Sequence, residues 1–423
     1  MSGRSFTFIH ASDLHIDSPL RGLMRYPGTQ TERLRGASRA AFANLVSAAI
    51  ERAVTFMVVA GDVFDGEWKD YNSGLWFTSE VRRLVAAGIP LYLLRGNHDA
   101  ESRLTKSLSL PEGVFEFSSS APVTVRVKVA DVALHGQSFG VPHVHQNLAR
   151  DYPAPVADVF NIGVLHTGLE GYEGHGHYAP CTVADLRAKG YDYWALGHIH
   201  ARQVVDENPW IVFPGNLQGR HARELGPKGA TLVHVVDGRV SQLEELHCDV
   251  ARWAHVEVDL SNIDTEEAAL LEMRRGLELA LSTVGDRLLA ARVTFNGTTR
   301  LDAVLRVDLV RIESEVRSRG LALSQDLWIE KVRLETRGLD RAPRREDGFT
   351  ALAERIAEAT LDPDEAGSLA RELGRLGDRL PANVTAVLQP KDAATILEAA
   401  PRATRYLAAL LALKAPAREG ASE

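Results

Sequence analysis

The chain has 423 residues, of which 45% are hydrophobic, and this content is too high for a disordered protein; its formal net charge is −8. No apolar run approaches the roughly 18 residues that span a bilayer, no signal-peptide core opens the chain, and two cysteines cannot build a disulfide framework, so we expect a cytoplasmic protein with no membrane partner. Because the net charge is acidic, nucleic acid would have to be bound through a local basic patch or a metal site.

Short apolar runs alternate with longer mixed segments in the first part of the chain. Runs rich in Val, Ile, Phe and Tyr predict buried strands at residues 6–11, 55–60, 89–95, 132–136, 160–166, 191–198 and 211–214. Helical patterns cover residues 38–53 and 74–87. This alternation predicts a layered α/β domain over residues 1–250.

The pattern changes after residue 250. All 15 histidines lie at or before His255, so chemistry that needs imidazole belongs to the first domain. The next segments predict strands at 255–261, 290–297 and 327–336, with helices at 265–282 and 300–317 between them. These segments predict a small α/β domain over residues 251–337.

The last part of the chain has a different composition. Residues 338–347 are charged and contain a proline, which predicts a linker. Apolar residues then recur at helical spacing in 349–359 and 404–413, so we expect amphipathic helices in a C-terminal region over 348–423.

Polar clusters follow five of the apolar runs directly, at the strand ends where open α/β sheets bind ligands. Their carboxylate, imidazole and amide groups suit Mn²⁺, Mg²⁺, Fe²⁺ or Zn²⁺. Two divalent cations would carry more positive charge than two aspartates neutralise, and the excess would attract a phosphate. Any one of these histidines could be an ordinary structural residue, but five ordered clusters are hard to explain by structure alone. The clusters are Asp13 with His15, Asp62 with Asp65, Asn97 with His98 and Asp99, His166, and His198 with His200.

Basic residues near these clusters are candidate phosphate contacts. Arg220 and His221 follow the run at 211–214 and could reach a phosphate, with ordinary surface placement as the alternative. Arg21 and Arg25 begin a series of five arginines that ends at Arg39 and could track a DNA backbone. A solvated helix face explains that series equally well.

The ordered series Asp-x-His, Gly-Asp-x-x-Asp, Gly-Asn-His-Asp, His and Gly-His-x-His resembles the calcineurin-like metallophosphoesterase superfamily. Within it, GDVFD with GNHD is similar to the SbcD-type DNA exonucleases, and DYWALGHIH and FPGNLQGRH are similar to their YhaO branch. The resemblance implies a four-layer β-sandwich flanked by helices, followed by a small α/β capping domain and C-terminal helices.

The same resemblance implies roles for the clustered residues. It implies two divalent metal ions, with Mn²⁺ as the first choice and Mg²⁺, Fe²⁺ or Zn²⁺ as alternatives. His98 would assist the leaving group and Asp65 would hold His98, with Asp99 as a rival for that supporting role. The implied metal ligands are Asp13, His15 and His200 for one ion, Asp62 as the bridge, and Asn97, His166 and His198 for the other.

The function expected from this resemblance is a metal-dependent phosphodiesterase. It would be a DNA exonuclease or endonuclease subunit of an SbcC–SbcD-like repair complex, in which a hydroxide activated by two metals attacks the phosphodiester. The implied partners are DNA, an SbcC-like or YhaN-like coiled-coil ATPase at the C-terminal helices, and a second copy of the chain. Two alternatives stay open: a small-molecule phosphodiesterase or nucleotidase, and a non-catalytic scaffold that binds DNA ends or the ATPase.

Overall fold

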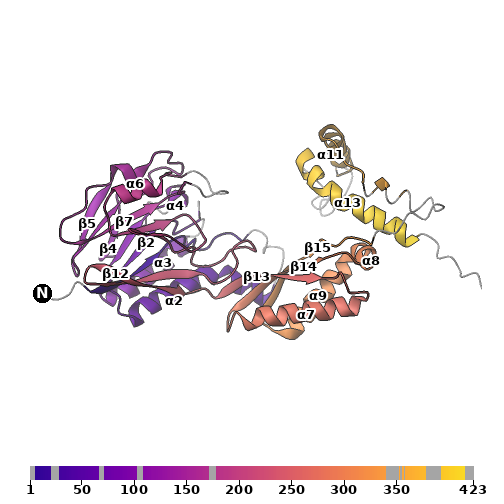
Figure 1. The fold of residues 1–423 in the computed structure, drawn as a ribbon, viewed down its shortest axis with the longest axis horizontal. Coiled ribbons are helices and arrows are strands. Elements are labelled where there is room, and N and C mark those ends of the chain that lie inside the picture. The colour runs from indigo at the N-terminus through magenta and orange to yellow at the C-terminus, as the bar shows by residue number, and fades with distance from the viewer. Residues whose placement is uncertain are drawn as a thin grey trace, which may run out of the picture. The chain divides into compact units, whose positions relative to one another are not determined.

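The computed structural model describes residues 5–20, 28–65, 71–101, 108–170, 178–339, 352, 355–356, 358–377 and 392–414. The chain forms two compact units (Figure 1). The first contains Met1–His255, Ala280–Ala291 and Gln325–Trp328, and the second contains Val256–Leu279, Arg292–Ser324 and Ile329–Glu423.

The first unit contains two six-stranded sheets. The first sheet has the order β12-β11-β1-β2-β3-β4, in which β1 to β4 are parallel and β11 and β12 are antiparallel additions. The second has the order β5-β6-β7-β8-β10-β9, with a parallel centre and antiparallel edge strands. The strands are β1 Phe6–Ala11, β2 Phe56–Ala60, β3 Leu91–Leu94, β4 Val114–Glu116, β5 Val123–Val127, β6 Val132–Gly136, β7 Phe160–His166, β8 Tyr193–Gly197, β9 Gln203–Glu207, β10 Trp210–Phe213, β11 Gly229–Val236 and β12 Arg239–His247.

A buried core fills the space between these sheets. Phe8 of β1 stacks on Phe56 of β2, with ring centroids 5.0 Å apart, and meets the edge of Tyr193 from the other sheet at 5.4 Å. Because successive strand residues point to opposite faces, Ile9 and Met57 lie on the outer side of the first sheet. The first unit is therefore a sandwich in which each sheet has one face in the shared core.

Helices cover the outer faces of the sandwich. The helices α2 Ala37–Glu51 and α3 Tyr71–Ala86 pack on the first sheet. On the second sheet, Trp194 and Ile211 pack with residues of α6 Val183–Ala188 and of the 3₁₀ turn η2 Leu148–Asp151. Each helix and sheet thus buries an apolar face, and the expected four-layer arrangement is confirmed (Figure 1).

Two further short helices belong to the first unit: α1 Thr29–Arg35, which precedes α2, and α4 Asn97–Glu101, which follows β3. Each of the seven predicted strands and both predicted helices of this unit is present, with ends that shift by a few residues. The structure adds β4, β5, β9, β11 and β12, which the apolar runs did not single out.

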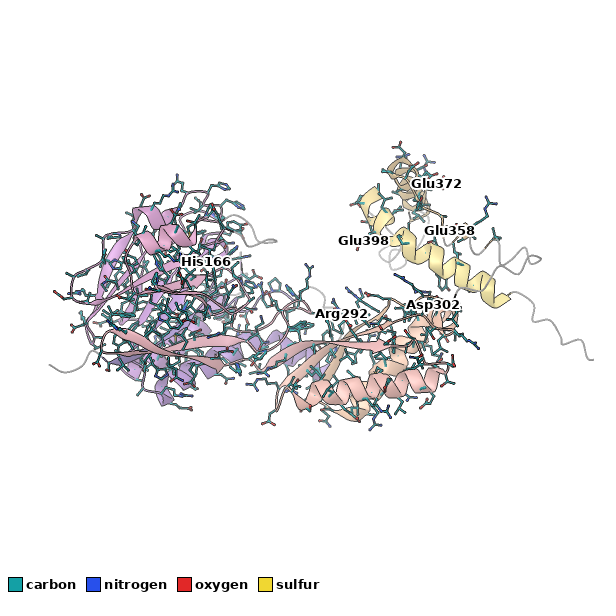
Figure 2. The ribbon with its side chains drawn as sticks, in the orientation of Figure 1. His166, Arg292, Asp302, Glu358, Glu372 and Glu398 are labelled. Atoms are coloured by element: carbon teal, nitrogen blue, oxygen red, sulfur yellow. The ribbon has the colours of Figure 1, made fainter. Side chains whose placement is uncertain are left out.

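A three-stranded sheet of order β13-β14-β15 follows in the chain. The predicted helix at 300–317 is wrong as a single element: the helix is interrupted at Asp308, whose backbone is not helical. In the second unit, Arg292 of β14 pairs with Glu330 of β15 at 2.8 Å, and Figure 2 marks Arg292. The elements are β13 Ala251–Asp259, α7 Glu266–Ser282, β14 Leu288–Asn296, α8 Asp302–Val307, α9 Leu309–Leu323 and β15 Leu327–Leu334.

The described C-terminal residues form two further helices, α11 Pro363–Gly377 and α13 Ala393–Lys414, and α13 contacts both α11 and α8. Helix α13 contains the predicted segment at 404–413, whereas most of the predicted helix at 349–359 and of the linker at 338–347 lies outside the described residues. Within the described part of the chain, we find no helix both long enough and apolar enough to cross a membrane.

Candidate metal centre

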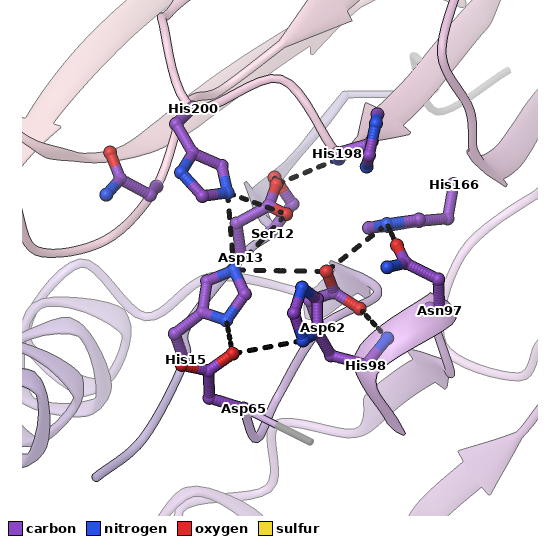
Figure 3. Close-up of polar contacts among 12 residues, drawn as sticks. Ser12, Asp13, His15, Asp62, Asp65, Asn97, His98, His166, His198 and His200 are labelled. Carbon is purple, nitrogen blue, oxygen red and sulfur yellow. Dashed lines mark hydrogen bonds and ion pairs between the residues drawn. The ribbon is translucent and has the colours of Figure 1, made fainter. Parts of the chain in front are cut away.

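The polar clusters lie at the carboxyl ends of five parallel strands. Asp13 and His15 follow β1, and Asp62 follows β2. Asn97 and His98 open α4 directly beyond β3. On the facing sheet, His166 ends β7, and His198 and His200 follow β8. Because strands of both sheets end at this edge, side chains far apart in sequence meet there (Figure 3).

The backbone at these strand ends is strained. Asp13, His15 and Asp62 have positive φ angles of 52°, 42° and 54°. Each such conformation costs on the order of 1–3 kcal/mol and persists only where the surroundings enforce it. Here the amide of Asp13 donates to Gly61 O at 2.9 Å, and the amide of His15 donates to Asp62 O at 3.0 Å. These bonds lock the first two strand ends to each other.

Glycines allow the strand ends to approach closely. A Cβ atom at Gly61 would lie 2.4 Å from Nδ1 of His166, and one at Gly96 would lie 2.3 Å from Oδ1 of Asp62. Neither distance is possible for a real side chain. The residues that precede Asp62 and Asn97 therefore have to lack a side chain if the clusters are to converge.

One set of possible ligand atoms comes from Asp13, His15 and His200, which lie within 4.8 Å of one another. Nε2 of His15 is 3.2 Å from Nε2 of His200, and Oδ1 of Asp13 is 3.6 Å from the latter nitrogen. This carboxylate oxygen is buried and has no hydrogen-bond partner among the described residues. A buried oxygen without a donor, facing two imidazole nitrogens, fits a cation well.

A second set comes from Asp13, Asp62 and His166. Oδ2 of Asp62 is 3.4 Å from Nε2 of His166 and 3.8 Å from Nε2 of His15, so this carboxylate lies between the two sets. Burial alone would raise the pKa of Asp62, but the His166 imidazole beside it outweighs burial and holds that pKa well below its usual range. The carboxylate is therefore ionised and able to bind a cation.

Asn97 and His198 complete the neighbourhood of the second set. Oδ1 of Asn97 is 3.0 Å from Nε2 of His166. The His198 ring lies edge-on to the His166 ring, with centroids 5.2 Å apart, and its amide donates to Oδ2 of Asp13 at 3.0 Å. All seven predicted ligands are thus brought together, as Figure 3 shows.

His98 lies beside this group. Its side chain is 37% exposed, and Nδ1 is 3.0 Å from Oδ1 of Asp65. Burial lowers the pKa of His98, but the bond to Asp65 and the nearby negative charges outweigh burial and raise that pKa above its ordinary value. Asp65 is therefore placed to orient the imidazole and to stabilise its protonated form.

Asp99 has a different set of partners. It is completely buried, and its carboxylate accepts backbone N–H groups of Val63, Phe64 and Gly96 at 3.0–3.1 Å. These bonds hold together the loops after β2 and β3. The geometry therefore favours Asp65 over Asp99 as the partner of His98.

The residues predicted to contact a phosphate differ in how closely they approach the candidate centre. Nη1 of Arg220 is 3.4 Å from Oδ2 of Asp65, and Nη2 is 3.4 Å from Nδ1 of His200, so Arg220 lies at the site. His221 is 56% exposed and neighbours Glu224 at 3.6 Å. Arg21 and Arg25 lie outside the described residues.

Later arginines of the same series are engaged in ion pairs. Carboxylates lie against Arg33, Arg35 and Arg39, which pair respectively with Asp326, Glu32 and Asp17. These pairings favour the structural interpretation of the described part of the series.

Glu224 is a site residue that sequence reasoning missed. Its carboxylate accepts from Nδ1 of His200 at 2.7 Å and from the amide of Arg220 at 2.6 Å. Burial by itself would raise the pKa of Glu224, but the bond to His200 and the charge of Arg220 hold it well below its usual range. Glu224 follows no apolar run and has no partner at ligand spacing, so the sequence offered no signal for it.

Comparison with known families agrees with this geometry. Residues 6–202 match the model of the calcineurin-like phosphoesterases. This part of the chain is therefore similar to the calcineurin-like phosphoesterase family. Residues 253–337 match the model described as the middle domain of metallophosphoesterase YhaO. The expected resemblance to the calcineurin-like phosphoesterases and to YhaO is confirmed over these residues.

Curated relatives match over part of their length. The uncharacterized metallophosphoesterase YhaO of Bacillus subtilis (strain 168) is 38% identical over 261 residues, which cover 60% of this chain and 63% of that protein. The DNA double-strand break repair protein Mre11 of Sulfurisphaera tokodaii is 27% identical over 251 residues, which cover 55% of this chain and 62% of that protein. The chain thus spans about three fifths of the length of these family members.

A likeness to a solved structure is weaker. The crystal structure of TT1561 of Thermus thermophilus has 15% sequence identity and a TM-score of 0.33, and it covers 58% of this chain and 99% of that one.

Proposed function

We propose that this chain hydrolyses phosphodiester bonds of DNA at a centre of two divalent cations, with Mn²⁺ as the first choice. The observation that carries the proposal is the position of Asp62 between the two groups of buried ligand atoms. A pair of cations bound on either side of this carboxylate would stabilise both the attacking and the leaving oxygen of a phosphodiester, as two-metal sites do. The donor set contains oxygen and imidazole nitrogen and suits Mn²⁺, while Mg²⁺, Fe²⁺ and Zn²⁺ are alternatives.

The residues present divide into two coordination groups. When bound, the two cations would acidify a water molecule and neutralise charge on the phosphate. Asp62 lies between the groups and would contribute to both. One group would be Asp13, His15 and His200, and the other Asn97, His166 and His198.

His98 is the proposed acid for the leaving group. Asp65 accepts the Nδ1 hydrogen, which leaves Nε2 to donate a proton to the departing 3′- or 5′-oxygen. The raised pKa keeps a larger fraction of His98 protonated near neutral pH. Arg220, held at the same Asp65 carboxylate, is the proposed contact for a phosphate oxygen.

The relatives support DNA as the substrate, because several members of the family that resemble this chain are named DNA double-strand break repair proteins. From this we infer a nuclease subunit of a repair complex that acts in the cytoplasm. We further propose that residues 251–337 cap the 1–250 nuclease domain, that 338–347 link it to the C-terminal region, and that 348–423 contact an SbcC-like or YhaN-like ATPase. The chain would act as a homodimer, and His221, Arg21 and Arg25 are further proposed substrate contacts.

One experiment separates the proposal from its alternatives. The protein is stripped of metal with a chelator, supplied with Mn²⁺, and given either labelled duplex DNA or bis-p-nitrophenyl phosphate. We expect cleavage of both substrates and loss of both activities in Asp62→Ala. The matched control is His247→Gln, because His247 is an exposed histidine that pairs with Glu245. Full activity of Asp62→Ala would refute the metal centre.

The substrate pattern decides the class of function. Hydrolysis of bis-p-nitrophenyl phosphate without cleavage of DNA would indicate a small-molecule phosphodiesterase. DNA binding without hydrolysis of either substrate would indicate a scaffold. A variant that ends at residue 344 should keep Mn²⁺-dependent hydrolysis and lose the ATPase partner.

A further inference from the structure

Two imidazoles at the candidate centre each have an oxygen atom within hydrogen-bond distance of Nδ1. Nδ1 of His166 lies 2.9 Å from the carbonyl oxygen of Ala60, and Nδ1 of His200 lies 2.7 Å from Oε1 of Glu224. A carboxylate oxygen can only accept, so Nδ1 of His200 has to carry a hydrogen. In the neutral ring of His200 the lone pair is then on Nε2, which lies 3.6 Å from Oδ1 of Asp13. His166 differs, because its Nε2 also lies 3.0 Å from the amide oxygen of Asn97, which can only accept.

Glu224 is itself fixed in position. The residue is 7% exposed, and Oε2 accepts from Nδ2 of Asn216 at 3.0 Å and from the amide of Arg220 at 2.6 Å. Both oxygens are therefore engaged, and Oε1 cannot turn away from His200 without breaking two other bonds. A nearly buried carboxylate is costly unless it is paired in this way.

Glu224 also reaches the proposed phosphate contact. Nη2 of Arg220 lies 3.7 Å from Oε1 of Glu224, and Nη1 lies 3.4 Å from Oδ2 of Asp65. The guanidinium thus lies between two carboxylates: that of Glu224, which bonds to the proposed ligand His200, and that of Asp65, which bonds to His98. A single side chain therefore orients both a ligand and a phosphate contact.

We propose that Glu224 is a positioning residue that fixes His200 with the Nε2 lone pair toward the cation and holds Arg220 at the edge of the site. This inference rests on the proposed metal centre. Groups that accept a hydrogen bond from the other ring nitrogen of a metal-binding histidine contribute on the order of 10–100-fold to metal affinity, because they fix the tautomer and increase the basicity of the ring.

The test is a calorimetric titration of the metal-free full chain with Mn²⁺. In Glu224→Ala, affinity at one of two sites should fall about 10–100-fold while the other site is kept. Glu224→Gln should lose less, because its amide oxygen can still accept from Nδ1 of His200. The matched control is Glu244→Gln, which removes a carboxylate paired with Arg52 and should bind Mn²⁺ as the wild type does.

A second readout separates positioning from a general effect on folding. Nitrogen-15 spectra of the metal-free protein should show His200 with its hydrogen on Nδ1 in the wild type and in Glu244→Gln, and a mixture of tautomers in Glu224→Ala. Glu224→Gln replaces one oxygen by a similar-sized amide group, so it keeps the test usable if the alanine variant does not fold. Circular dichroism of each variant checks the fold.

The results that would overturn the inference are specific. Wild-type Mn²⁺ affinity in a folded Glu224 variant would refute it, as would a wild-type His200 with its hydrogen on Nε2. A wild-type protein that binds Mn²⁺ and cleaves no phosphodiester would refute the proposed function and leave the role of Glu224 in place. A wild-type protein that binds no Mn²⁺ would refute both.

Discussion

Replacement of Gly96 by alanine tests the convergence of the strand ends directly. The added Cβ would lie 2.3 Å from Oδ1 of Asp62, whereas ordinary contact begins at 3.4 Å, so the carboxylate has to retreat by about 1 Å. The same Cβ would lie 2.9 Å from Cε1 of His166 and would press on that ring as well. A misplacement of about 1 Å can cost on the order of 100-fold in rate, which is about 2.7 kcal/mol in the activation barrier.

The assay is hydrolysis of bis-p-nitrophenyl phosphate at saturating Mn²⁺, together with Mn²⁺ affinity by calorimetry. We expect Gly96→Ala to lose about 100-fold in kcat and to bind Mn²⁺ more weakly, because Asp62 lies between the two ligand groups. The control is Gly140→Ala, where the new Cβ would meet Ser119 at an ordinary 3.7 Å. A folded Gly96→Ala protein with activity within about twofold of the wild type would refute the argument from close approach.

Three further measurements test other parts of the structure. His98→Gln should lower kcat by about 10²–10⁴-fold at unchanged Mn²⁺ affinity, because His98 is proposed as an acid and not as a ligand; a parallel loss of Mn²⁺ binding would contradict that assignment. Burial lowers the pKa of His10 to about 3, below the unfolded value of 6.5, so its contribution to stability is complete above pH 6.5 and is lost as the pH falls toward 3. The free energy of unfolding should therefore fall by about 1.4 kcal/mol more per pH unit between pH 6 and 4 in the wild type than in His10→Gln, and equal slopes in chemical denaturation would count against this. Mn²⁺ at about 100 times its Kd should stabilise the wild type by about 2.7 kcal/mol and Asp62→Ala by much less, and equal shifts in the two thermal midpoints would show that the ion binds elsewhere.

Local patterns were sufficient to predict much of the first unit. A buried parallel strand appears in sequence as a continuous apolar run. Each such run could be recognised from its own residues alone, as it was for β1, β2, β3, β7 and β8. Strand β12 was missed because exposed and half-buried residues interrupt any apolar run along it. The break at Asp308 was missed because apolar residues continue at helical spacing across it.

The sequence by itself determined which side chains gather at the candidate site. Each cluster directly follows its own strand, and a parallel sheet brings the ends of its strands to one edge, so order along the chain predicts which clusters meet within each sheet. That the two sheets bring these edges together is decided by the tertiary structure. It also supplied the glycines, such as Gly96, that allow close approach.

Only the tertiary structure decided which groups support that site. Asp99 is next to His98 in sequence, whereas Asp65 belongs to the preceding cluster; only the fold shows that Asp99 accepts backbone amides while Asp65 meets the imidazole. Glu224 reaches His200 from a loop that no local pattern marks. Hydrogen-bond partners of this kind depend on distances between segments that are remote in the chain, and neither periodicity nor spacing encodes such distances.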